Sequence, residues 1–155
     1  MGVEIERKFL VNKEKWEVID KPVKMMFWQG YLTIDPEKTI RVRITDSSAY
    51  LTIKGISVGA TRAEFEYEIP KADAELLLAK FTIADVRKIR YEVIFKHKLW
   101  EVDEFLDKNE GLIIAEIELT RESEPFELPD WVEREVTNEE KYYNSNLSVN
   151  PYKNW

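Results

Sequence analysis

Apolar and polar residues alternate with a period of two along most of the chain. This period is typical of β-strands that bury one face. Turn signals such as Asp35-Pro36 and the stretch from Asp107 to Gly111 interrupt the alternation. The pattern predicts strands over Glu4–Val11, Gln29–Ile34, Thr39–Thr45, Ala49–Lys54, Thr61–Ile69, Val86–Phe95, Lys98–Phe105 and Leu112–Thr120.

Helical signals are fewer than strand signals. Pro70 is a good first residue for a helix, and the apolar residues behind it have helical spacing. That stripe consists of Ala74, Leu77, Leu78 and Phe81. A short helix is predicted after Asn12, and Thr137 with Glu140 three residues later predicts a capping box at a third helix.

Charged residues also follow the period of two, and their signs segregate between strands. Arg41 and Arg43 share one face of their strand, whereas Glu116 and Glu118 share one face of theirs. The ordinary interpretation is an antiparallel sheet with one face in the core and one in water. Runs of like charge and the use of arginine, which binds phosphate or carboxylate oxygens in a planar, bidentate way, weaken that interpretation.

A sheet that closes on itself gives these charges another role. If the charged faces line a shared interior, acids and bases converge on one cavity and must be paired with each other or with a ligand. Carboxylates suit a hard divalent cation, and arginine and lysine suit phosphate oxygens. Together these groups suit a metal-bound polyphosphate and phosphoryl transfer.

Composition narrows the possible classes of function and of metal site. The 155 residues suit one domain, over residues 1–155, and the net charge of −7 argues against general binding to nucleic acid or acidic membranes. The chain has no cysteine and a single histidine, His97, so any metal is expected on carboxylates, with Mg²⁺, Mn²⁺ or Ca²⁺ as candidates. No run approaches the length of a membrane span and no signal-peptide core is seen, so a cytoplasmic location is expected.

At this point the motifs resemble a known family. EIERKFL resembles the ExExK signature of the CYTH domain, the triphosphate tunnel metalloenzymes. QGYL, RVR, LTIKG, EFEYEI, RKIRY, EVDEF and AEIEL follow in the family's order. The resemblance implies an α+β, mainly β fold, namely a closed eight-stranded antiparallel barrel that is open at both ends, with a charged lumen and a few covering helices.

The resemblance also implies roles for individual residues. Metal binding is implied for seven acids, Glu4, Glu6, Glu64, Glu66, Asp103, Glu116 and Glu118. Binding of the triphosphate is implied for Lys8, Arg41, Arg43, Lys54, Arg62, Lys88, Arg90 and, from the closing helix, Lys141. Lys8 and Tyr31 are the catalytic candidates, because a tyrosine in the QGYL segment contacts the signature lysine in small bacterial triphosphatases of the family.

The predicted activity is hydrolysis of a triphosphate with Mg²⁺ or Mn²⁺ as cofactor. Inorganic tripolyphosphate is the leading substrate, since the short chain shows no added loop that would hold a nucleobase, and nucleoside triphosphatase activity is compatible with it. The alternatives are a class IV-type adenylate cyclase, then a thiamine triphosphatase, then a polyphosphate-binding module without catalysis. A homodimer is compatible with the family and with the aromatic content.

Overall fold

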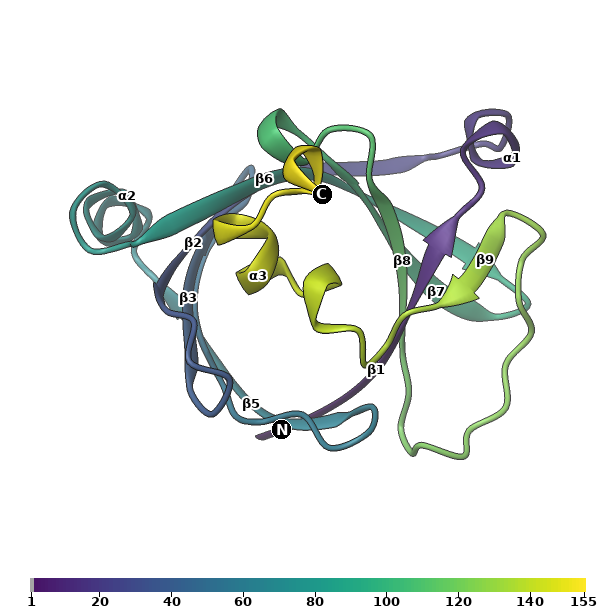
Figure 1. Ribbon diagram of the computed structural model, residues 1–155, viewed down its shortest axis with the longest axis horizontal. Coiled ribbons are helices and arrows are strands. Elements are labelled where there is room, and N and C mark those ends of the chain that lie inside the picture. The colour runs from purple at the N-terminus through teal and green to yellow at the C-terminus, as the bar shows by residue number, and fades with distance from the viewer. Residues whose placement is uncertain (1) are drawn as a thin grey trace.

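The computed structural model describes residues 2–155 of the chain, and its strands wrap into a barrel (Figure 1). The strands are β1 (Gly2–Val11), β2 (Val23–Thr33), β3 (Thr39–Ile44), β4 (Ala49–Lys54), β5 (Thr61–Ile69), β6 (Ala84–Phe95), β7 (Lys98–Phe105), β8 (Ile113–Glu118) and β9 (Val132–Glu135). The α-helices are α1 (Lys13–Glu17), α2 (Lys71–Lys80) and α3 (Asn144–Val149). Short 3₁₀ turns are η1 (Asp107–Asn109), η2 (Glu140–Tyr142) and η3 (Tyr152–Asn154).

The barrel closes through neighbouring antiparallel strands. Hydrogen bonding runs in the order β5-β4-β3-β2-β6-β7-β8-β1, and β1 returns to β5 with Glu4 opposite Arg62. The ninth strand, β9, lies outside this ring and pairs with the second half of β1, near Phe9 and Val11. The predicted closed, eight-stranded antiparallel barrel is therefore confirmed, with one extra strand beside it. Within residues 2–155, no helix has the length and apolar character needed to cross a membrane.

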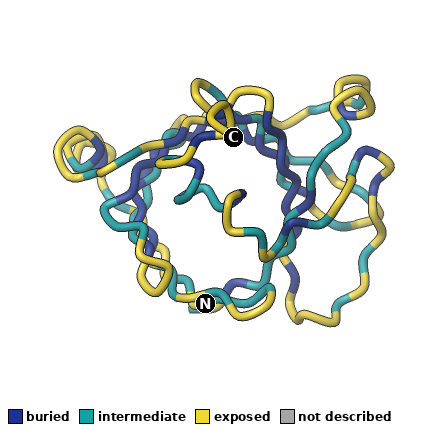
Figure 2. The backbone as a smooth tube through the Cα atoms, viewed as in Figure 1, coloured by how far each residue is buried: buried dark blue, intermediate teal, exposed yellow. Residues whose placement is uncertain are grey.

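The main apolar core lies outside the barrel wall, because the inner wall is charged. Trp16, Trp100 and Trp131 are buried together there with Phe9, where α1 and the segment before β9 cover the sheet. Buried positions occur along the upper, left-hand and right-hand strands of Figure 2, and the β5 side is more exposed. Each fully buried large side chain contributes about 1.5–3 kcal/mol of hydrophobic stabilisation.

Helix α2 covers a second patch of the outer wall over β2, β3 and β4. Ala74 and Leu78 of the predicted apolar stripe face the sheet and pack with Val42, and Leu77 packs beside them. Phe81 differs from the prediction, because it follows the end of α2 and is exposed. Gly30 of the QGYL motif makes this approach possible: a Cβ there would lie 2.6 Å from Leu78 and 2.7 Å from Thr82. The glycine is needed for close packing of a helix, while its neighbours in the motif face the lumen.

One end of the lumen is filled with apolar side chains. Val86, Phe105 and Ile114 lie on the inward faces of their strands and pack with Leu147 of α3 and with Tyr142. In Figure 1 the C-terminal segment with α3 lies within the ring of strands. The resemblance implied a barrel open at both ends; in the structure, apolar side chains of the C-terminal segment pack into one of these ends.

The closing segment also differs from its sequence-based prediction. The capping box at Thr137 is wrong, because the Thr137 hydroxyl accepts a hydrogen bond from the backbone N–H of Lys8 and contacts Glu135. The helix begins later, at Asn144, after η2. Strand β9 and the first half of β2 were also missed, whereas α1 and α2 were predicted correctly.

The outward-facing Arg7 of β1 has a partner on β9. Its Nε and Nη2 donate to Glu135 at 2.8 and 2.6 Å, and its guanidinium lies 4.9 Å from the ring centre of Phe126. Arg7 therefore fastens the extra strand and the preceding loop to the barrel. It points away from the lumen side chains of the same strand.

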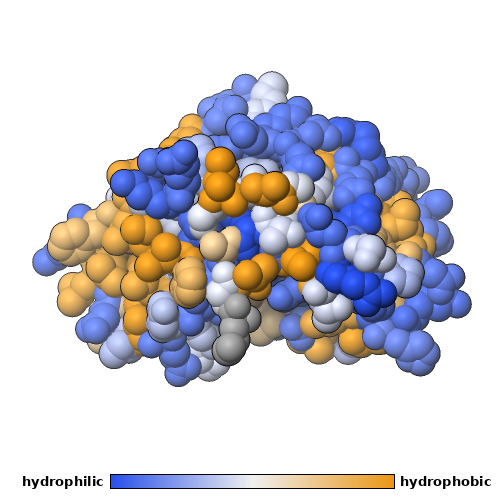
Figure 3. Space-filling view, turned by 90° about the horizontal axis from the view of Figure 1, so that it is seen from below, coloured by the Kyte–Doolittle hydropathy of each residue, from blue (hydrophilic) through white to orange (hydrophobic). Residues whose placement is uncertain are grey.

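The side of the barrel where β5 lies carries exposed apolar residues among polar ones (Figure 3). Val3, Phe65 and Tyr67 are the largest of them on β1 and β5, and all three are exposed. His97 lies in the tight turn between β6 and β7 with a positive φ of 66°, as expected for a turn residue.

Candidate active site

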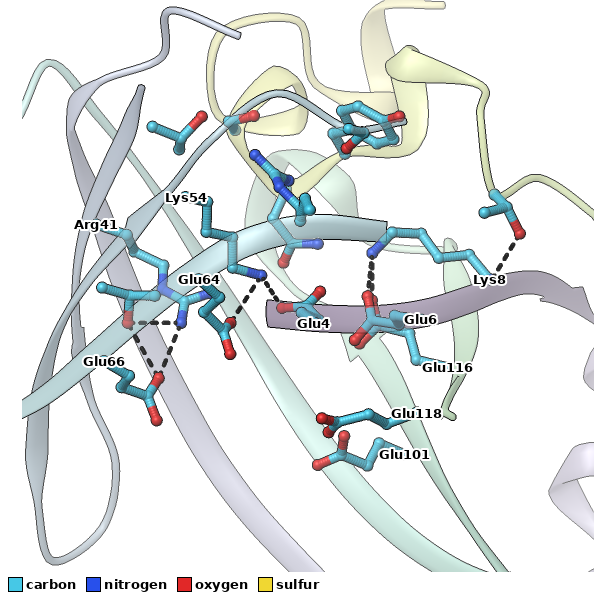
Figure 4. A pocket seen from close by; sticks show the side chains of 18 of the residues that line it. Glu4, Glu6, Lys8, Arg41, Lys54, Glu64, Glu66, Glu101, Glu116 and Glu118 are labelled. Carbon is cyan, nitrogen blue, oxygen red and sulfur yellow. Dashed lines mark hydrogen bonds and ion pairs between the residues drawn. The ribbon is translucent and has the colours of Figure 1, made fainter. Parts of the chain in front are cut away.

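The remainder of the lumen forms a charged cavity of about 230 Å³. Figure 4 shows acidic and basic side chains from several strands pointing into it. All the predicted site residues except Asp103 and Lys141 line this cavity. The period of two explains the convergence, because each strand turns alternate residues inward as the sheet closes.

The basic side of the cavity is built mainly by β3 and β6. Arg41 is held by Thr52 at 3.0 Å and by Glu66 at 3.4 Å, and its buried Nε has no hydrogen-bond partner within residues 2–155. Burial lowers the pKa of Arg43 to about 9, with a further contribution from the positive charges of Arg41 and Arg90. This concentration of positive charge favours the binding of an anion.

The acidic side comes from β1, β7 and β8. Glu6 lies opposite Glu118, and Glu101 lies opposite Glu116. Burial raises the pKa of Glu6 to about 7, helped by the negative charge of Glu116. Burial and then Glu4 and Glu6 likewise raise the pKa of Glu118. The crowding of carboxylates favours the binding of a cation.

Lys8 lies on the acidic side of the cavity. Its ammonium donates to Glu6 at 3.1 Å and also contacts Glu116 (Figure 4). Burial by itself would lower the pKa of Lys8, but the charges of Glu116 and Glu6 outweigh it and hold the pKa above its usual range. Lys8 is therefore a permanent cation, suited to stabilising negative charge on a phosphate.

Lys88 and Arg90 form a second basic group, and both are hydrogen-bonded to Asp103 below the cavity surface. Arg90 donates to Asp103 at 2.7 and 2.8 Å, and Lys88 donates to it at 2.7 Å. Burial opposes ionisation of Asp103, but Arg90 and Lys88 hold its pKa below its usual range. Burial lowers the pKa of Lys88 to about 7 even though Asp103 opposes this. The structure places Asp103 beneath the cavity surface, and its role as a metal ligand stays a prediction.

The remaining predicted residues differ in their contacts and in their distance from the cavity. Lys54 donates to Glu4 at 2.8 Å and lies 3.3 Å from Glu64, while Arg62 donates to the backbone carbonyl of Gly55. Lys141 is exposed, and its Nζ lies 4.5 Å from the ring centre of Trp155, away from the cavity lining. Its contact with substrate stays a prediction.

Tyr31 lines the cavity on β2, next to a residue that the sequence did not single out. Its hydroxyl accepts a hydrogen bond from the side-chain amide of Gln29 at 2.8 Å. The contact between Tyr31 and Lys8 that the resemblance implies stays a prediction, since the amine of Lys8 bonds Glu6 and Glu116.

Several further residues that line or support the cavity were not predicted as site residues. They include Gln29, Thr52, Glu101 and Asn144. Glu101 could have been found from its sequence position, because it shares a strand face with Asp103 and lies opposite Glu116. Asn144 could not, because its place depends on how the C-terminal segment folds back into the barrel.

The chemistry of the donor set fits a divalent cation. Five carboxylates reach the acidic side of the cavity, namely Glu4, Glu6, Glu101, Glu116 and Glu118. Burial is the main cause that raises the pKa of Glu6 and that of Glu118, and neighbouring carboxylates raise both further. In the described part of the chain, however, no three such side chains converge in a liganding arrangement. Several are instead bonded to Lys8, Lys54 or Arg90.

The chain is similar in sequence and in fold to CYTH domain proteins and to inorganic triphosphatases. The CYTH domain model matches residues 2–150. An inorganic triphosphatase of Acetivibrio thermocellus is 48% identical over 156 residues, covering 100% of this chain and 99% of the relative. One of Nitrosomonas europaea is 31% identical, covering 94% and 97%. A crystal structure of an inorganic triphosphatase superposes with a TM-score of 0.67 at 30% identity and covers 94% of each chain.

Proposed function

The chain belongs to the CYTH domain family, and on that premise we propose that it hydrolyses inorganic tripolyphosphate to pyrophosphate and phosphate with the help of a divalent metal ion. One observation carries the proposal. A single cavity has arginine and lysine on one side and carboxylates on the other, so it can hold a polyphosphate and a cation together. The two curated relatives named above are both inorganic triphosphatases.

The family implies a divalent metal, and we propose that it is Mg²⁺ or Mn²⁺. Glu4, Glu6 and Glu118 would hold it, with Glu101 and Glu116 beside them, because hard divalent cations take oxygen ligands. Bound there, the metal would neutralise phosphate charge and lower the pKa of a coordinated water. Asp103 is too deeply paired with Arg90 and Lys88 to be the first choice.

The basic residues would bind and orient the phosphate chain. Arg41 and Arg43 each offer guanidinium N–H groups towards the cavity, and Lys54 stands on the neighbouring strand. The protonated Lys8 would stabilise negative charge near the carboxylates, and Tyr31 would donate a hydrogen bond to a phosphate oxygen. Catalysis in such a site is mainly positioning and charge neutralisation.

The shape of the cavity favours an inorganic substrate over a nucleotide. Its volume of about 230 Å³ lies below the roughly 300–1,000 Å³ of pockets that hold drug-sized organic ligands. Among the described residues, Tyr31 and Tyr143 are the only aromatic side chains in the lining. A class IV-type adenylate cyclase would need a place for adenine and ribose, so we rank it second.

One assay tests the proposal and its alternatives. The purified protein is incubated with tripolyphosphate, ATP or thiamine triphosphate, with Mg²⁺ or Mn²⁺ and with EDTA as control. We expect phosphate release from tripolyphosphate that depends on the metal and exceeds release from the other substrates. Formation of cyclic AMP and pyrophosphate from ATP would favour the cyclase. Tight binding of tripolyphosphate without turnover would favour a binding module.

A further inference from the structure

Gln29 is fully buried on the inward face of β2, behind the cavity lining. Its side-chain amide makes three hydrogen bonds. The oxygen accepts from Nε of Arg43 at 3.0 Å, and the nitrogen donates to the Tyr31 hydroxyl at 2.8 Å and to Oδ1 of Asn144 at 3.2 Å. Both N–H groups and the carbonyl are thus in use, and Gln29 itself lies outside the residues that line the cavity.

The direction of these hydrogen bonds is fixed by the partners. Arg43 Nε can only donate, so the amide atom that faces it must be the oxygen of Gln29. The other amide atom is then the nitrogen, which must donate to Tyr31. Lys88 confirms the same polarity at Asn144, because its ammonium donates to Oδ1 at 2.8 Å and leaves that atom an acceptor.

This polarity decides where the Tyr31 proton points. A tyrosine hydroxyl has one proton, and Tyr31 uses an oxygen lone pair to accept from Gln29. Within residues 2–155 the hydroxyl proton has no acceptor, and Tyr31 lines the cavity. The free direction for that proton is towards the cavity, where a phosphate oxygen would accept it.

We propose that Gln29 is a positioning residue that aims the Tyr31 hydroxyl proton and the Arg43 guanidinium at the same bound phosphate. The inference rests on the proposed triphosphatase function. Gln29 also ties this wall to the C-terminal segment through Asn144, so the closed end of the barrel and the substrate wall share one hydrogen-bonded unit.

Gln29→Glu is the most informative variant. A carboxylate still accepts from Arg43, but it cannot donate to Tyr31, so the hydroxyl must turn and donate to the carboxylate. We therefore expect kcat for tripolyphosphate to fall by roughly ten- to a hundredfold, as in Tyr31→Phe. Gln29→Met leaves the hydroxyl free to rotate but removes the acceptor of Arg43. We therefore expect kcat to fall less than in Gln29→Glu, while KM for tripolyphosphate rises.

A double-variant cycle separates positioning from a structural effect. We expect Gln29→Glu combined with Tyr31→Phe to lose no more than about twofold beyond Tyr31→Phe alone, because both remove the same donated hydrogen bond. Val42→Ala is the stability control. It opens the core on neighbouring β3, and we expect it to lower the melting temperature without lowering kcat.

Distinct results overturn the inference and the proposed function. Wild-type kcat in Gln29→Glu, losses that multiply in the double variant, or an equal kcat loss in Val42→Ala would overturn the role of Gln29. A wild-type protein that releases no phosphate from tripolyphosphate would overturn the proposed function instead. In that case calorimetry of tripolyphosphate binding without metal still tests the role of Gln29. If Gln29 positions Tyr31, Gln29→Glu and Tyr31→Phe must weaken the affinity by similar factors.

Discussion

Two groups of ion pairs in the lumen use the same residue types in very different ways. At the buried group, Lys88 and Arg90 close on Asp103, and their side chains are at most 9% exposed. At the open group, Lys54 pairs with Glu4 and Glu64, and Arg41 pairs with a Glu66 side chain that is 40% exposed. The cations Arg41 and Arg90 are equally buried, and the groups differ in their carboxylates: Asp103 is fully buried, whereas Glu64 and Glu66 reach solvent and leave that group available to a ligand.

The largest expected effect lies at the buried group. Asp103→Ala would leave two buried cations without their carboxylate, and we expect it to lower the free energy of unfolding by about 3–5 kcal/mol. Urea denaturation followed by circular dichroism measures the change. A loss below about 1 kcal/mol would show that this group is not a structural support.

The next effect concerns the acidic side of the cavity. Glu6→Gln removes a carboxylate that is buried near Glu116, so we expect unchanged or higher stability. Activity on tripolyphosphate should nevertheless fall about a hundredfold or more, because a proposed metal ligand is lost. Full activity of this variant would remove Glu6 from the proposed site, and calorimetric titration with Mn²⁺ gives an independent readout of the metal.

A smaller effect is expected at the open group. Glu66→Gln weakens a partly exposed pair, while Arg41 keeps its hydrogen bond to Thr52. We expect the free energy of unfolding to change by less than about 1 kcal/mol. A change comparable with that of Asp103→Ala would erase the distinction between the two groups.

The smallest effect concerns an ion pair on the outer wall and depends on pH. The hydrogen bond from Arg7 is the main cause that holds the pKa of Glu135 below its ordinary value of 4.5. A depressed pKa means that the stabilisation is present above pH 4.5 and is lost as the pH falls through the pKa of the folded state.

Comparison of the wild type with Arg7→Met tests this dependence. Because Glu135 is about one-third exposed, solvent screens the pair, and we expect the variant to be less stable by at most about 1 kcal/mol at pH 6. The difference should shrink below pH 4. A difference that grows in acid would contradict the sign of the pKa shift.

The sequence predicted the parts of the molecule that follow from the period of two. The strand that carries Arg41 and Arg43 and the one that carries Glu116 and Glu118 were placed correctly, because alternation reports both the strand and its inward face. The first half of β2 was missed because its sequence, VKMMFW, does not alternate. The four-residue β9 is too short to show a period.

The sequence could not predict how deep in the lumen each inward-facing residue lies. Glu101 and Asp103 share a strand face, yet one lines the cavity and the other is buried under Arg90. The partner of Arg7 on β9 and the contact of Asn144 with Gln29 join residues more than 100 positions apart, and only the closed barrel brings them together. Local pattern reports the face of a strand but not the level of a residue along the barrel axis.

The filled end of the barrel has a consequence for how substrate enters the cavity and how products leave it. Leu147 and Tyr142 pack there with their apolar neighbours, so we expect a phosphate chain and its fragments to share the opposite entrance. Arrival and departure then compete for one route. Pyrophosphate that lingers on Arg41 and Arg43 would keep the next chain out, and the enzyme would be slowed by its own product as it accumulates.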